Sequence, residues 1–267
     1  MRRKAAVAGL FYPGSRDSLL KWLETAMDIT PQKLYDAKGV MVPHAGYIYS
    51  GHVAAVVYSS IYAPEVAIIM GPNHTGLGTK ASILTEGEWE TPLGIVKIDE
   101  YLASSILKGS SVLEEDYLAH LKEHSVEVQV PFLQYLNPSI KIVPIVLAPL
   151  GIDEITDIST AISQAVNSYP GKVLVVASSD MSHYVPSYVA KEKDMKALER
   201  IVALDWKGLL RTVFENDISM CGYIPTAIMI DASLKLGAER AELLSYSNSG
   251  EVSGEEPVVG YAGVVIY

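Results

Sequence analysis

The sequence predicts an α/β fold in which residues 1–267 form a single domain, with a mostly parallel mixed sheet flanked by helices. Short apolar runs rich in Val and Ile alternate with longer segments whose apolar residues follow helical spacing. No linker, internal repeat or low-complexity tract interrupts this alternation. Because strand, helix and strand follow one another, right-handed crossovers and parallel strands with helices on both faces are expected.

The individual elements follow from the same patterns. Four apolar runs predict strands buried on both faces, at 39–42, 66–70, 140–147 and 173–176. Helical spacing predicts helices at 17–27, where Asp17 can cap the first turn, and at 50–62, 153–168, 191–204 and 224–236. The segments 81–86 and 94–98 predict a β-hairpin insertion, and 243–246 with 258–267 predict an antiparallel edge of the sheet.

Composition excludes several classes of protein. The 21 Lys and Arg against 31 Asp and Glu give a net charge of -10, so no basic surface for nucleic acid or anionic lipid is expected. A single cysteine excludes an internal disulfide or a zinc ribbon and indicates a reducing compartment, so a cytoplasmic protein is expected. No apolar run is long enough to predict a membrane span.

Histidines follow three of the predicted strands. The strand ends continue into Pro43-His44-Ala45-Gly46, Gly71-Pro72-Asn73-His74 and Ser178-Ser179-Asp180-Met181-Ser182-His183. In open α/β sheets, ligands bind outside the carboxyl ends of the strands, so these side chains can converge although they are far apart in sequence. Any one of these histidines could instead be structural, but their repetition at strand ends favours a site that the fold assembles.

Two further features could join that site. Cys221 precedes a predicted helix, and a helix N-terminus favours the thiolate that binds metals; the alternative is a small buried apolar side chain. His124 and Glu127 are three residues apart, so on one helical face the carboxylate could orient the imidazole; both could equally be solvated.

Five ordered motifs carry a resemblance to a known family. They are Pro43-His44-Ala45-Gly46-Tyr47-x-Tyr49-Ser50-Gly51, Gly71-Pro72-Asn73-His74, Glu123-His124-Ser125-x-Glu127, Ser178-Ser179-Asp180-x-x-His183 and Cys221-Gly222. Together they resemble the Memo family, and the flanking segments fit as well, so the resemblance covers essentially the whole chain.

The resemblance implies a fold similar to the class III extradiol, LigB-like dioxygenases. It implies that His44, His74 and Cys221 are metal ligands and that His183 is an acid/base with Asp180 beside it. His124 and Glu127 belong to the family motif, which assigns them no role; together with Asn73 they are expected to lie behind the ligands or to contact substrate. Because Cys221 stands where the dioxygenases have a carboxylate, the resemblance implies a redox-active metal, Fe(II) or copper, with zinc as an alternative. It also implies a small-molecule or peptide ligand, with radical-SAM and AMMECR-type proteins as pathway partners.

Three functions remain open from the sequence. The leading hypothesis is a metal-binding redox protein of the non-haem oxygenase type, in which His183 moves protons. The second is a peptide- or protein-binding module that keeps the pocket without turnover. The third is a metal-dependent hydrolase that uses a metal-activated water. The sequence does not determine the substrate, the metal or the oligomeric state.

Overall fold

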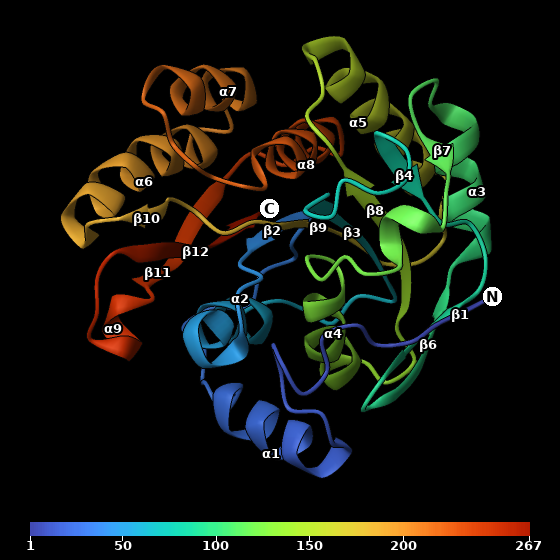
Figure 1. Cartoon of the computed structure of the whole chain (residues 1–267). Coiled ribbons are helices and arrows are strands. Elements are labelled where there is room, and N and C mark those ends of the chain that lie inside the picture. The colour runs from blue at the N-terminus through green and yellow to red at the C-terminus, as the bar shows by residue number, and fades with distance from the viewer.

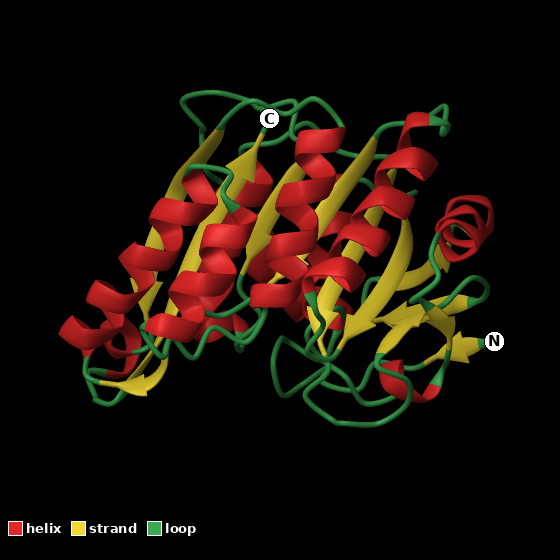
Figure 2. Ribbon diagram, turned by 90° about the horizontal axis from the view of Figure 1, so that it is seen from above, coloured by secondary structure: helices red, strands yellow, loops and turns green.

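The computed structural model describes residues 1–267 and shows one mixed sheet of 12 strands with helices on both faces (Figures 1 and 2). The strands are β1 (Arg2–Arg3), β2 (Gly39–Val42), β3 (Val66–Pro72), β4 (Ala81–Ile83), β5 (Glu88–Thr91), β6 (Gly94–Ile98), β7 (Glu114–Glu115), β8 (Lys141–Leu147), β9 (Val173–Ser178), β10 (His183–Val185), β11 (Ala241–Asn248) and β12 (Val258–Ile266). The predicted α/β fold is confirmed.

The helices occupy both sides of this sheet. They are α1 (Arg16–Ala26), α2 (His52–Ser59), α3 (Glu100–Gly109), α4 (Val130–Leu136), α5 (Ile152–Asn167), α6 (Ser187–Val202), α7 (Trp206–Glu215), α8 (Tyr223–Lys235) and α9 (Gly250–Ser253). Figure 1 shows α3, α5, α6, α7 and α8 over one face and α1, α2 and α4 over the other. None of the helices combines the length and the apolar composition needed to cross a bilayer.

The centre of the sheet is parallel. Strands β6, β8, β3, β9 and β2 lie side by side in that order with parallel pairing, and β12 continues the sheet antiparallel to β2. All seven residues of β3 and all six of β9 are buried, because helices cover both faces of these strands. The predicted antiparallel strands near the C-terminus are confirmed as β11 and β12.

The predicted hairpin between 81–86 and 94–98 is wrong. The antiparallel partner of β6 is β5, with Trp89 opposite Val96, whereas β4 pairs with β8 and β7. The alternation along β5, in which Trp89 and Thr91 are buried and their neighbours are half-buried, marks a strand that the sequence interpretation treated as a connection. The helix predicted from 17 also begins one residue earlier, and Ser15 rather than Asp17 caps it.

A buried ion pair fastens the N-terminal segment to the rest of the fold. The Arg3 guanidinium, which is 1% exposed, donates to Glu127 Oε2 at 2.6 Å and to the carbonyl oxygens of His120 and Glu123. The Glu127 carboxylate also accepts a hydrogen bond from the Tyr12 hydroxyl at 2.6 Å. These contacts cross more than 100 residues of sequence, so they join the chain start to the segment before α4.

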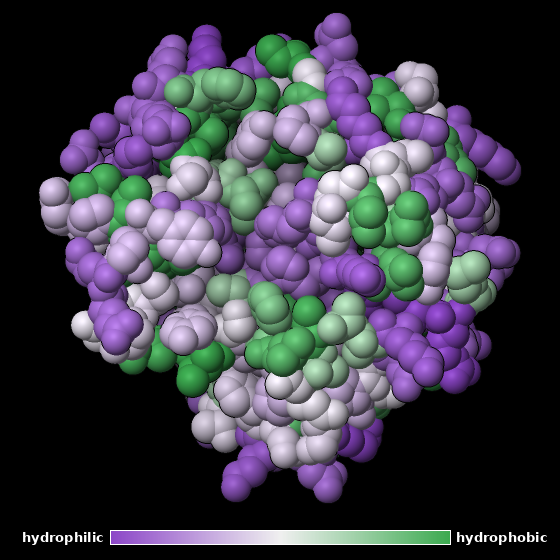
Figure 3. All heavy atoms as spheres, viewed as in Figure 1, coloured by the Kyte–Doolittle hydropathy of each residue, from purple (hydrophilic) through white to green (hydrophobic).

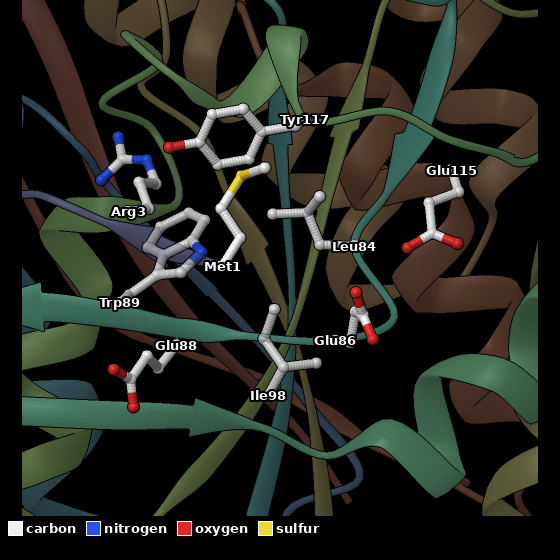
Figure 4. Close-up of a pocket in the computed structure, with 9 residues that line it drawn as sticks. All are labelled: Met1, Arg3, Leu84, Glu86, Glu88, Trp89, Ile98, Glu115 and Tyr117. Carbon is white, nitrogen blue, oxygen red and sulfur yellow. The ribbon is translucent and has the colours of Figure 1, made fainter.

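A small cavity of about 90 Å³ adjoins this ion pair (Figure 4). The Arg3 guanidinium carbon lies 4.1 Å from the centre of the Trp89 ring at its wall. The other lining residues are Met1, Leu84, Glu86, Glu88, Ile98, Glu115 and Tyr117. They lie in or beside β1, β4, β5, β6 and β7, so this cavity is separate from the carboxyl ends of β2, β3 and β9.

Replacing Glu127 tests the importance of the buried ion pair. We expect Glu127→Ala to lower the free energy of unfolding by about 3–5 kcal/mol, because the Arg3 charge then remains buried without its partner. The exposed Arg2–Glu88 pair is the matched control, and Arg2→Ala is expected to lower the stability far less, because water already solvates this pair. Urea unfolding of both variants measures the difference; equal losses would contradict this interpretation.

Candidate metal centre

The carboxyl ends of β2, β3 and β9 lie together at one edge of the sheet. In the parallel register, Val42 pairs with Ser178 and Met70 pairs with Ala177, so the segments that follow these residues leave the sheet at the same place. Figure 3 shows hydrophilic side chains gathered at the centre of the face toward which these strands run. The expected convergence of strand-end residues is therefore present.

His44, His74 and Cys221 come together at this edge. One potential ligand atom from each lies within 4.8 Å of the other two, and His44 Nε2 is 3.2 Å from Cys221 Sγ. Two donors of one tetrahedral ion at ordinary Zn–N and Zn–S bond lengths are about 3.5 Å apart, so this spacing fits a shared ion. His44 is buried and His74 is exposed, so the centre is open to solvent on the His74 side.

Hydrogen bonds fix the tautomer of His44. Ser178 Oγ donates its proton to the Ser125 carbonyl at 2.6 Å and accepts from Gln129 Nε2 at 2.8 Å. Its remaining lone pair faces His44 Nδ1 at 3.0 Å, so Nδ1 must carry the proton. The Nε2 lone pair of His44 is consequently free and directed toward the Cys221 side.

Glu123 performs the corresponding task for His74. Its carboxylate accepts from the His74 backbone N–H at 2.6 Å and from the ring Nδ1 at 2.9 Å, which leaves Nε2 of His74 free. Burial alone would raise the pKa of the Glu123 carboxyl, but the hydrogen bond and charge of His74 and the Ser125 N–H lower it to about 2. Glu123 is therefore an ionised acceptor that is almost completely shielded from solvent.

The His124 ring lies against the same centre. It stacks on His74 with ring centres 4.7 Å apart and meets His44 edge-on at 5.5 Å. Its Nδ1 is 3.4 Å from Glu123 Oε1. The carboxylate beside His124 is thus Glu123, and the expected pairing with Glu127 is not observed because Glu127 binds Arg3 and the N-terminal backbone.

Burial shapes the charges at the centre. Burial, together with the charges of His74 and His124, holds the pKa of His44 well below its usual range, so this ring is a neutral donor. Burial, followed by the charge of Asp180, raises the pKa of the Cys221 thiol. Without a cation the centre therefore holds a neutral imidazole beside a protonated thiol.

Asp180 and His183 have different partners from those expected. Asp180 Oδ1 accepts the backbone N–H groups of His44 and Ala45, and its Oδ2 is 4.0 Å from His44 Nε2, so Asp180 shapes the loop after β2. His183 is oriented by Ser219, whose carbonyl is 2.8 Å from Nδ1 and whose hydroxyl accepts the His183 N–H. This leaves His183 Nε2 free, and the charge of His183 reaches Asp180.

Asn73 stays within its own loop. Its side-chain oxygen accepts from the backbone N–H groups of Thr75 and Gly76, and its amide donates to the Leu77 carbonyl. These bonds stabilise the turn that carries His74, and all side-chain hydrogen bonds of Asn73 stay within this turn.

Sequence reasoning missed four polar side chains that hold the site: Glu123, Ser178, Gln129 and Ser219. Glu123 adjoins His124 in the motif, so its position was visible. The sequence instead suggested Glu127 as the carboxylate that orients the His124 ring. Ser178 was visible as the last residue of a buried strand. Gln129 and Ser219 carried no signal, because both reach the site only through the fold.

The close approach of Gly71 to Ser125 provides a test of this packing. A Cβ at Gly71 would lie 2.3 Å from Ser125 Oγ, whereas one at Gly46 would meet nothing closer than 3.6 Å. We expect Gly71→Ala to cost about 1–3 kcal/mol of unfolding free energy through overpacking, and Gly46→Ala to be close to neutral. Urea unfolding measures both, and equal stability of the two variants would refute the packing argument.

Comparison with known proteins shows the family to which the chain belongs. The profile of the Memo-like protein family matches residues 3–265. MEMO1 family proteins from Caldivirga maquilingensis and Ignicoccus hospitalis are 43% and 45% identical to the chain, and the alignments cover 99% and 98% of this chain and 99% and 97% of theirs. An uncharacterized protein from Escherichia coli K12, JW3007, shares the fold with a TM-score of 0.56 at 12% identity, over 86% of this chain and 99% of its own. The chain belongs to the Memo-like family.

Proposed function

We propose that this protein is a metal-dependent redox protein of the non-haem oxygenase type, with His44, His74 and Cys221 as the metal ligands. The observation that carries the proposal is the convergence of two imidazoles and one thiol at the carboxyl edge of a parallel sheet. Both rings offer Nε2 lone pairs, because Ser178 and Glu123 hold the opposite nitrogens.

The donor set also indicates which ions fit. Two imidazoles and a soft thiolate suit copper and zinc, and Fe(II) remains compatible with the two histidines. When bound, a redox-active ion would supply electron transfer and activation of a small co-substrate. Three protein ligands would leave at least one coordination position of the ion open for the co-substrate. The exposed side of the centre, at His74, would give the co-substrate access from solvent.

His183 is suited to move a proton. The Ser219 carbonyl holds its Nδ1–H, so Nε2 is the basic nitrogen and can accept a proton from a substrate hydroxyl. Asp180 acts differently, because it fixes the backbone of His44 and Ala45 and thereby positions the His44 ring. We therefore assign proton transfer to His183 and positioning to Asp180.

Metal loading tests the ligand assignment. We expect His44→Ala and Cys221→Ser to lose most of the Fe(II) or copper that the wild type retains after anaerobic loading and desalting. Glu123→Gln keeps the side-chain shape but weakens the hold on His74, so its metal affinity should fall by about 10–100-fold. Elemental analysis measures the metal content, and His52→Ala at an exposed helix position is the control. Wild-type metal content in His44→Ala would exclude the assignment.

Oxygen uptake with a panel of catechols tests the assignment of His183. We expect His183→Ala to keep its metal and to lose about 10²-fold or more of any turnover, because the proton acceptor is removed. Tyr188→Ala, at an exposed position of α6, serves as the control for general effects of a substitution near β10, the strand that carries His183. Unchanged turnover in His183→Ala with full metal content would contradict the assignment.

A binding module is the second candidate function. It is favoured by Cys221, whose buried thiol has a raised pKa and replaces the carboxylate of the dioxygenases that the family resembles. In that case the protein would retain no metal, consume no oxygen and bind a peptide in the same pocket. The metal-loading experiment distinguishes the two functions directly.

A further inference from the structure

An open groove of about 480 Å³ lies beside the metal centre, and neither the ligands nor His183 line it. The loop after β8, helix α7 and the first residue of α8 form its walls. The lining residues are Pro149, Leu150, Gly151, Ile152, Leu210, Arg211, Phe214, Glu215 and Tyr223. Its volume lies within the range of about 300–1,000 Å³ that is typical of small-molecule sites.

The groove exposes large apolar side chains to water. Phe214 is 78% exposed and Ile152 is 52% exposed, and they face the same hollow together with Leu150 and Leu210. Figure 3 shows apolar side chains in this region, near α7 and the start of α5. A contiguous apolar surface next to a polar centre indicates that an apolar ligand covers it.

The connectivity of the chain places the groove next to the metal centre. Tyr223 follows Cys221 by two residues, so their Cα atoms are at most about 7.6 Å apart. The loop from Pro149 leaves the sheet at the same edge as β3, because Pro72 pairs with Leu147 in parallel register. A ligand in the groove therefore lies next to the residue that carries the thiol.

The charge at the groove favours an anion. Arg211 lines it and makes no ion pair or side-chain hydrogen bond in the structure, and Glu215 is the only acidic lining residue. The helices α5 and α8, of 16 and 13 residues, both begin at the groove. The N-terminus of α5 already has Asp153 and Glu154 in its first turn, and Glu154 accepts the Gly151 N–H at 2.7 Å, whereas the first turn of α8 has no acidic residue. The positive groups at the apolar floor of the groove are thus the N-terminus of α8 and the Arg211 guanidinium, in a chain of net charge -10.

We propose that this groove is the substrate subsite of the centre and that its ligand is a small amphipathic carboxylate. The aryl or alkyl body packs on Ile152, Leu210 and Phe214, and the carboxylate faces Arg211. The role of this groove as a subsite of the metal centre rests on the proposed function, whereas the class of ligand is inferred from the residues that line the groove.

A fluorescent probe tests the ligand class on metal-free protein. We titrate 8-anilinonaphthalene-1-sulfonate, an aryl anion, and displace it with 4-phenylbutyrate, 4-phenylbutan-1-ol or 4-phenylbutylamine. We expect the carboxylate to displace the probe at a concentration at least tenfold lower than the amine requires. This concentration should also be lower than the one that the alcohol requires. Displacement by the amine or the alcohol at equal or lower concentration would overturn the anion assignment.

Variants locate the probe. Phe214→Ser is expected to weaken probe binding tenfold or more, and Arg211→Gln is expected to remove the preference for the carboxylate. Val252→Ser, an exposed apolar residue on α9, and Lys108→Gln, an exposed cation on α3, are the matched controls and should behave as wild type. Equal effects of the groove variants and the controls would overturn the groove as the binding site.

Amide chemical shifts test the connection to the centre. On adding 4-phenylbutyrate to metal-free protein, we expect shifts in Leu210 to Glu215 and in Cys221 to Tyr223. Shifts in α7 that leave Cys221 and Tyr223 unchanged would show a separate pocket and overturn the subsite. Because no metal is present, these results are distinct from a failure of the metal-loading experiment.

Discussion

The parallel pairing of β2, β3 and β9 is the constraint on which the site depends. This pairing sends three chain segments out of the sheet at one edge, within a few residues of Val42, Pro72 and Ser178. None of the three segments could form a site alone, since their histidines are separated by tens of residues in sequence. The strands that fix this edge are buried on both faces, so the apolar core determines the positions of the polar side chains.

Burial at this edge forces the polar groups to satisfy one another. Ser178 Oγ has one proton and two lone pairs, and Ser125, Gln129 and His44 use all three. Glu123, at 1% exposure, compensates for its burial by accepting backbone and ring N–H groups. Both His44 and His74 are therefore held in one tautomer by the protein alone, so binding an ion would require little further ordering of these rings.

The sequence predicted the elements with strong local patterns and missed those defined by packing. The central strands β3 and β9 were visible because a strand buried on both faces reads as a continuous apolar run. Strand β5 was not visible in the sequence, because its alternating pattern is short and its pairing partner is determined by the fold. The histidines that converge at the sheet edge were visible at strand ends, but the partner of His124 was assigned by helical spacing. That spacing does not apply there, since helical structure begins only at Glu127, after His124.

The charges around Cys221 show why a cation suits this centre. A thiolate at this position would be a buried anion beside the buried carboxylate of Asp180, and the two would repel each other in a poorly solvated environment. The neutral ring of His44 offers a lone pair and no compensating positive charge. A divalent ion between these groups would offset the negative charges of the thiolate and of the nearby carboxylates of Asp180 and Glu123. A thiolate and a carboxylate carry the same charge, so a cysteine in place of a carboxylate would change only the softness of the donor and with it the metal preference, without requiring a different fold.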